Sequence, residues 1–130
     1  MRRYFASLVV LLLIVMASCD RQSTLTYRIK NNVSDTIMVV RSRTDAPQLT
    51  DTFRISYNEE VTVGVNREGS EHVSTYKEKD VKLRKFIRME VYNYLGEQST
   101  TDFLRTDQWV YKENGSHMAN YTATVSRDDF

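Results

Sequence analysis

The residue whose chemistry is most clearly defined is Cys19, the only cysteine in the 130-residue chain. It follows an apolar segment, Tyr4 to Val15, that begins after two arginines and ends in Met16-Ala17-Ser18. A positively charged start, a short apolar stretch and small residues before a cleavage point form the pattern of a secretory signal peptide. We therefore expect residues 1–18 to be a signal peptide, with the Cys19 thiol at the start of the mature chain.

This segment resembles the signal peptide of bacterial lipoproteins, which ends in a lipobox of apolar, small, small and cysteine residues. The resemblance covers residues 1–20 and departs from the family at Met16, where leucine is usual. It implies that Met16, Ala17 and Ser18 are the lipobox and that a diacylglyceryl group is joined to the Cys19 sulfur. It also implies that the new amino group is acylated after cleavage. Covalent diacylglycerol and N-acyl lipid on Cys19 would then anchor the protein, and no other cofactor is expected.

Two other interpretations of the segment fit less well. A membrane-spanning helix needs about 20 apolar residues, whereas this stretch is interrupted by Ser7 and ends at Ala17. A cleaved but unlipidated chain would leave a lone thiol without an internal partner in an oxidising compartment. Lipidation removes that difficulty. Two or more acyl chains give stable attachment because each buried CH₂ contributes about 0.8 kcal/mol.

Charge and length set further limits on the mature chain. The whole sequence has 18 basic and 17 acidic residues, and loss of Arg2 and Arg3 with the signal peptide would leave a net charge of −1. Such a balance offers no electrostatic footprint for nucleic acid and no polybasic tract for anionic lipid. We expect residues 19–23 to be a lipidated tether and residues 24–130 to form a single domain.

Apolar residues alternate along much of the mature chain, as they do in strands that place one face on a core. A strand over Thr36 to Arg41 is predicted from its β-branched residues. Alternation marks three other early strands: Thr24 to Lys30, Thr52 to Tyr57 (with Phe53, Ile55 and Tyr57 in phase) and Val61 to Val65. The last two flank Asn58-Glu59, which predicts a hairpin. The lone proline, Pro47, is expected in a loop, where it interrupts no ladder.

The later part of the chain continues the alternation. Phe86 to Tyr94 is expected to turn Ile87, Met89 and Val91 inward, a short strand surrounds Trp109, and residues 121–126 alternate most regularly. Residues 70–85 break the pattern and predict a solvated loop or a charged edge strand, with a short helix as the alternative. Together these segments predict an all-β fold, an antiparallel β-sandwich of about seven strands (Ig-like) or a related barrel.

The sequence carries few catalytic or metal-binding motifs. His72 and His117 lack the spacing of a metal-binding helix, and a zinc site would need more nitrogen or sulfur ligands. The segment Gly64 to Glu71 has the glycine spacing of a phosphate-binding loop but lacks its lysine. The pairs Glu59-Glu60 and Asp128-Asp129 could be acid–base partners or calcium ligands, although solvated charges are more usual at chain or strand ends. We therefore expect no catalytic site and no metal.

Aromatic residues are the remaining candidates for a binding site. Tyr92 and Tyr94 fall on the strand face opposite Met89, so they could stack on sugar rings if that face is exposed. Trp109 and Tyr121 are expected in the core, because aromatic side chains dominate sandwich interiors. A ligand-binding role for Tyr92 and Tyr94 is left open.

The mature chain also resembles the small β-sandwich lipoproteins of Bacteroidetes-type envelopes. The resemblance lies in the late Trp109 and in a final Tyr121-to-Val125 strand that is followed by Asp-Asp-Phe. In those bacteria, secreted proteins can be O-glycosylated at Asp-Ser/Thr before a small or apolar residue. Asp35-Thr36-Ile37 matches this pattern, which implies Thr36 as a glycosylation site.

Localisation and function are inferred from the anchor and from the absence of catalytic motifs. Asp20 would retain an enterobacterial lipoprotein at the inner membrane, but that rule does not hold for Bacteroidetes-type lipoproteins, so we expect the outer membrane. Only Asp20 is acidic before Asp35, which makes a poor signal for surface export, so the periplasmic face is favoured over the cell surface. The leading hypothesis is a non-catalytic, lipid-anchored binding protein of the cell envelope, with a protein partner in a multiprotein assembly such as a type VI secretion-like complex. The alternatives are a glycan-binding accessory lipoprotein and an inhibitor or immunity lipoprotein.

Overall fold

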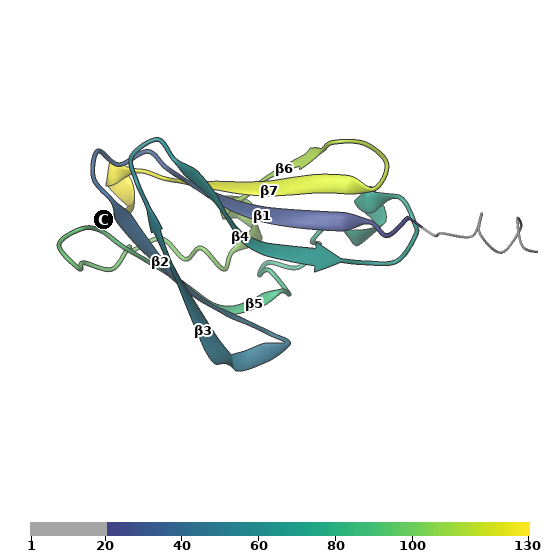
Figure 1. Cartoon of the computed structure of the whole chain (residues 1–130), viewed down its shortest axis with the longest axis horizontal. Helices are drawn as coiled ribbons and strands as arrows, with labels where there is room; N and C mark the ends of the chain where they lie inside the picture. Colours follow the sequence, from purple (N-terminus) through teal and green to yellow (C-terminus); the bar gives the residue numbers. More distant parts are fainter. Residues whose placement is uncertain (1–20) are drawn as a thin grey trace, which may run out of the picture.

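The computed structural model of the chain describes residues 21–130. Within them seven strands form two sheets that pack face to face (Figure 1), which confirms the predicted all-β sandwich. The strands are β1 (Thr24–Asn31), β2 (Ile37–Arg43), β3 (Ala46–Ile55), β4 (Glu60–Arg67), β5 (Phe86–Tyr92), β6 (Val110–Glu113) and β7 (Met118–Val125). Short 3-10 helices occur at η1 (Val73–Tyr76), η2 (Thr106–Gln108) and η3 (Arg127–Asp129).

The two sheets differ in size and in strand direction. One has the order β4-β1-β7-β6, and the other has the order β3-β2-β5. Neighbouring strands are antiparallel except β1 and β7, which run parallel with Tyr27 opposite Tyr121. The first and last strands of the domain therefore lie side by side in the middle of the larger sheet, where each has a neighbour on both edges.

The hairpin predicted between residues 52–57 and 61–65 is wrong, because these strands lie in different sheets. β3 pairs with β2, whereas β4 pairs with β1 after the chain crosses the sandwich at residues 56–59. In this connection Asn58 has a φ of 61°, and Glu59 Oε2 accepts a hydrogen bond from Ser56 N at 3.0 Å. A tight asparagine turn serves a crossing between sheets as well as a hairpin, so the local sequence does not separate the two.

The core lies between the sheets and is centred on Tyr27. Its ring stacks on Tyr121 with centroids 5.2 Å apart, and it meets Phe86 and Trp109 edge-on at 5.1 and 6.0 Å. The contact with Phe86 joins the two sheets, since Tyr27 belongs to β1 and Phe86 to β5. Tyr121 and Trp109 are 1% and 6% exposed, which confirms the prediction that both belong to the core.

The predicted alternation fails at the start of β5. Met89 and Val91 are buried as expected, but Ile87 is 49% exposed and Phe86 is buried in its place. The β2 ladder faces Phe86 and Arg88 with consecutive residues, so Ile87 is an extra residue in the strand. A bulge of this kind changes the face to which the side chains before it point, and it turns the Phe86 ring toward Tyr27.

Pro47 and residues 70–85 also depart in part from expectation. Pro47 lies in β3 rather than in a loop, but β3 is an edge strand whose pairing with β2 shifts near this position. Edge strands and bulges are where a missing N–H is tolerated. Residues 70–85 form a loop that includes η1, yet the loop is not wholly solvated, because Val73, Glu78 and Leu83 are buried.

Gly64 in β4 allows the two sheets to approach closely at the Phe86 ring. A Cβ at position 64 would lie 2.5 Å from Phe86 Cζ, which is closer than carbon atoms pack. We expect Gly64→Ala to lower the free energy of unfolding by about 1–3 kcal/mol, as overpacked cores do, measured by urea denaturation. Because Phe86→Leu opens the same space, the double variant should lose less than the sum of the two single losses. Additive losses would contradict this account of the packing.

Candidate functional site

The buried side chain of Asn31, at the end of β1, holds together the loops at one end of the sandwich. Its Nδ2 donates to the carbonyl oxygens of Asp35 at 2.7 Å and Ile55 at 2.9 Å, and its Oδ1 accepts from Val33 N at 2.8 Å. The β1–β2 and β3–β4 loops are thereby locked to one another. We call this end the distal surface and define it as residues 32–36, 54–59, 93–98 and 127–130.

The loop after β5 is fixed by Asn93 in a similar way. Asn93 Oδ1 accepts from the backbone N–H groups of Leu95 and Glu97 at 3.0 Å each, and Nδ2 donates to Glu97 Oε2 at 2.6 Å. Gly96 has a φ of 83°, a left-handed conformation that glycine adopts without a steric penalty. The loop therefore presents its side chains on a backbone that is already ordered.

Three large apolar side chains project from these ordered loops into solvent. Tyr57, Tyr94 and Leu95 are 60%, 65% and 65% exposed, and they border a cleft of about 580 Å³. This end of the sandwich lies opposite the end at which the described chain enters β1 (Figure 1). Exposed apolar side chains on an ordered scaffold suit binding, because little conformational freedom is lost when they are covered.

The structure separates the two tyrosines that the sequence paired. Tyr92 is half-buried in β5, and its hydroxyl donates to Glu90 Oε2 at 2.7 Å, a hydrogen bond that raises the pKa of Tyr92. Of the two, only Tyr94 borders the cleft. Tyr57 lies with it there, although its alternation with Ile55 in the sequence predicted an inward side chain.

Thr36, the predicted glycosylation site, is exposed within the distal surface. It borders a neighbouring cleft of about 290 Å³, whose other lining residues include Tyr94 and Arg54. Its side chain is therefore accessible to a modifying enzyme, and a glycan at this position would stand beside Tyr94. The modification itself stays a prediction.

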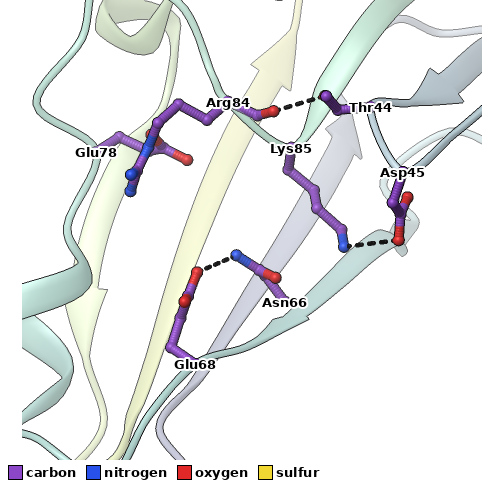
Figure 2. Close-up of a pocket in the computed structure, with 7 residues that line it drawn as sticks. All are labelled: Thr44, Asp45, Asn66, Glu68, Glu78, Arg84 and Lys85. Carbon is purple, nitrogen blue, oxygen red and sulfur yellow. Dashed lines mark hydrogen bonds and ion pairs between the residues drawn. The ribbon is translucent and has the colours of Figure 1, made fainter.

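A cleft of about 260 Å³ on the side of the sandwich gathers polar and charged residues from the β2–β3 turn, from the end of β4 and the residue after it, and from residues 78–85 (Figure 2). Three pairs of side chains interact along its walls: Lys85 with Asp45 at 3.5 Å, Arg84 with Glu78 at 3.0 Å, and Asn66 with Glu68. A further hydrogen bond at 2.6 Å joins the Thr44 hydroxyl to the Arg84 carbonyl. These groups form hydrogen bonds and ion pairs with one another, so the cleft joins separate parts of the fold. We call its lining residues the charged seam: Thr44, Asp45, Asn66, Glu68, Glu78, Arg84 and Lys85.

Glu78 is the most buried charge of this seam, with a side chain only 2% exposed. Tyr27 donates its hydroxyl to Oε1 at 3.0 Å, and Arg84 donates Nε–H to Oε2 at 3.0 Å. The Tyr121 hydroxyl accepts from the backbone N–H of Glu78 at 2.6 Å. Burial, with the nearby Glu78 carboxylate as the second cause, raises the pKa of Tyr27 far above its usual range. No sequence signal marked Glu78, which stands in a segment rich in exposed charges.

Another cleft, of about 560 Å³, has Trp109, Tyr111 and Tyr121 among its lining residues. The Lys77 ammonium lies 4.8 Å from the centroid of the Tyr111 ring, so this aromatic face already has a cation over it. Burial, together with the hydrogen bond to Glu113, raises the pKa of Tyr111 to about 12. This cleft therefore lacks the free aromatic side chains that mark the distal surface.

The other sequence candidates are dispersed over the described residues. His72 caps η1, and His117 Nδ1 lies 3.1 Å from Ser23 Oγ at the end of the sandwich where β1 begins. Glu60 forms an ion pair with β1, and Asp129 caps η3. Among residues 21–130, no group of three or more His, Cys, Asp or Glu side chains could hold a metal ion. No helix in this range is long and apolar enough to cross a membrane.

The predicted lipidation site, Cys19, and the lipobox residues Met16, Ala17 and Ser18 lie outside the described residues. Close to them in sequence, Ser23 is already fixed in the domain. It is fully buried, its backbone bonds to residues 68 and 69, and its hydroxyl donates to the carbonyl of residue 71. The end of the predicted tether is therefore part of the packed structure.

Comparison with known proteins does not assign the chain to a family. No protein-family model matches the chain, and no curated protein sequence or solved structure matches it. The fold and its surfaces define a β-sandwich domain with one ordered, aromatic end, and function must be argued from that end.

Replacing Glu78 tests whether the charged seam holds the fold together. We expect Glu78→Ala to lower the free energy of unfolding by about 2–3 kcal/mol, because the buried Tyr27 hydroxyl would lose its acceptor. Glu78→Gln should cost less, since an amide oxygen can still accept that bond. Urea denaturation of both variants is the measurement. The exposed Glu71→Ala is the control and should change stability by less than about 0.5 kcal/mol; equal losses for Glu71→Ala and Glu78→Ala would refute the account.

Proposed function

We propose that this chain is a lipid-anchored, non-catalytic binding protein of the cell envelope, held at the outer membrane. It works as a subunit of a multiprotein envelope assembly, for which a type VI secretion-like membrane complex is one setting, and it binds a protein partner. The observation that supports this most directly is the exposure of Tyr57, Tyr94 and Leu95 on loops that Asn31 and Asn93 already hold in place.

A protein partner suits these side chains better than a sugar does. Aromatic and aliphatic anchors surrounded by polar groups are the usual composition of the centre of a protein interface. Leu95 has no ring to stack on a sugar, and Tyr92 hydrogen-bonds to Glu90 outside the cleft. The glycan-binding alternative would therefore use Tyr57 with Tyr94 in place of the predicted pair Tyr92 and Tyr94.

The charged seam supports binding rather than catalysis. A general acid or base must reach the proton that it transfers. Both carboxylate oxygens of Glu78 instead accept hydrogen bonds from Tyr27 and Arg84 inside the fold. The nearby Lys85 ammonium lies within ion-pair distance of Asp45. The ionisable groups of the seam that could act as acids or bases therefore interact with one another.

The proposed anchor and the distal surface would lie at opposite ends of β1. Only Asp20, Arg21 and Gln22 separate Cys19 from the fixed Ser23, so the lipid and the domain stand no more than about 15 Å apart. β1 then leads directly from Ser23 to Asn31 beneath the distal surface. Lipidation at Cys19 would thus turn the exposed aromatic side chains away from the membrane and toward other envelope proteins.

The lipid anchor is tested by Cys19→Ala in the native host. We expect the variant to be unlipidated and released from the membrane fraction, because the thiol is the proposed acylation site. Intact-mass spectrometry and fractionation of cells measure the two effects. Asp20→Asn should stay acylated and membrane-bound, which controls for damage to the signal peptide. A Cys19→Ala chain that is still acylated and membrane-bound would contradict the proposal of an anchor at this residue.

The binding surface is tested by crosslinking in native-host cells that carry the full chain. A photoreactive side chain replaces the exposed Asn32 in the distal cleft, and protein adducts are quantified by immunoblot and identified by mass spectrometry. We expect the double variant Tyr94→Ala/Leu95→Ala to lower the yield of the main protein adduct by at least about tenfold, since each central anchor contributes about 2 kcal/mol or more and every 1.4 kcal/mol is about tenfold in affinity. Its stability should change by less than about 0.5 kcal/mol per position, as at other exposed sites.

A matched control is the pair Val81→Ala and Val110→Ala, both 71% exposed but outside the distal surface. These changes remove apolar area of similar exposure and should leave the adduct intact. Loss of the adduct in the control as well would show that exposed apolar area in general, and not the distal surface, governs association. An adduct that consists of polysaccharide would replace the protein partner by the glycan alternative.

A further inference from the structure

The distal surface is acidic as well as aromatic. Five carboxylates lie on it, against two guanidinium groups: Asp35, Glu59, Glu97, Asp128 and Asp129, with Arg54 and Arg127. The chain from residue 19 onward has a net charge of −1, so negative charge is concentrated at this end and the remainder of the domain is slightly positive. Such an uneven distribution creates a local field that attracts oppositely charged partners.

The carboxylates of the distal surface are not neutralised by neighbouring cations. Within residues 21–130, the ion pairs of the structure include none of these five residues. Glu97 and Asp129 accept hydrogen bonds from neutral groups, which orients them without cancelling their charge. The side cleft shows the opposite arrangement, since Lys85 there faces Asp45. Asp45 and Glu78 of the seam therefore form ion pairs, whereas no carboxylate of the distal surface does so within the described residues.

We propose that the distal surface binds an envelope protein whose contact region is basic, with lysine or arginine side chains around apolar sockets. Tyr57, Tyr94 and Leu95 enter the sockets, and the surrounding carboxylates face the cations. This inference rests on the proposed function, because it specifies the chemistry of the partner that the same surface binds. Charges at the rim of an interface act mainly on the rate of encounter and on the choice of partner.

The experiment uses the full chain with the photoreactive side chain at position 32, in native-host cells and in envelopes isolated from them. The test variant is Glu59→Gln/Glu97→Gln/Asp128→Asn, in which each new amide keeps an oxygen that can accept hydrogen bonds. Asp35 is retained, because changing it would also alter the predicted Asp35-Thr36 glycosylation motif. The control variant is Glu71→Gln/Asp80→Asn/Glu113→Gln, which neutralises the same number of exposed carboxylates elsewhere.

We expect the test variant to lower the yield of the protein adduct by roughly fivefold or more, while the control keeps it, since complementary charge raises association rates. Raising sodium chloride from about 50 to about 500 mM in the isolated envelopes should lower the yield for the unaltered chain, because salt screens exposed charges. That decrease should be smaller for the test variant. The partner peptide joined to position 32, identified by mass spectrometry, should lie in a lysine- or arginine-rich region.

The outcomes separate this inference from the proposed function. An adduct that requires Tyr94 and Leu95 but ignores the three neutralisations and the salt would overturn the basic partner and leave a protein partner standing. A crosslinked region that is acidic or uncharged would do the same. Absence of any protein adduct from position 32, with the chain folded and membrane-bound, would overturn both. Thermal unfolding of the test variant close to that of the control excludes loss of structure as the cause.

Discussion

A hydroxyl group at the centre of the core sets the conditions under which this sandwich can close. Tyr27 packs on aromatic rings from both sheets, and an unbonded phenol at that position would cost about 1–3 kcal/mol. The acceptor is Glu78, a carboxylate that must itself be compensated once it is buried, and Arg84 provides the charge. A polar loop is thereby required by the core, which explains why residues 77–85 are held against the sandwich although they form no strand.

This requirement also explains how chemistry is distributed over the molecule. The group that looks most reactive is the buried carboxylate of Glu78, between Tyr27 and Arg84. Its hydrogen bonds to both residues stabilise the fold. The distal surface has the opposite character, because Asn31 beneath it and Asn93 within it bond to backbone groups, while Tyr57, Tyr94 and Leu95 stay exposed. Order in these loops comes from the hydrogen bonds of the Asn31 and Asn93 amides rather than from burial of Tyr57 or Tyr94. The residues that order these loops are therefore different from the residues that the loops expose.

Sequence patterns that depend on neighbouring residues predicted this structure well, whereas features created by contacts between distant residues were missed. Alternation identified the buried faces of β1 and β7, since that pattern depends only on neighbouring residues. It misplaced Ile87 because a bulge is created by the pairing strand, and it paired residues 52–57 with 61–65 because a tight turn does not specify the sheet that the chain enters next. Tyr94 was a candidate from its strand face, whereas Glu78 and Asn31 look like ordinary loop residues until distant partners are placed beside them.

The two ends of β1 give the domain a direction. At one end Ser23 is buried and bonded to the loop at residues 68–71, and at the other Asn31 organises the distal surface. The strand between them is central in its sheet, paired with β4 and β7 along its length, and its eight residues span about 27 Å. A strand paired on both edges is rigid, so it fixes the distance between its two ends. If the chain is tethered just before Ser23, the fold sets the height of the aromatic, acidic end above its attachment, and the proposed partner would meet it at that height.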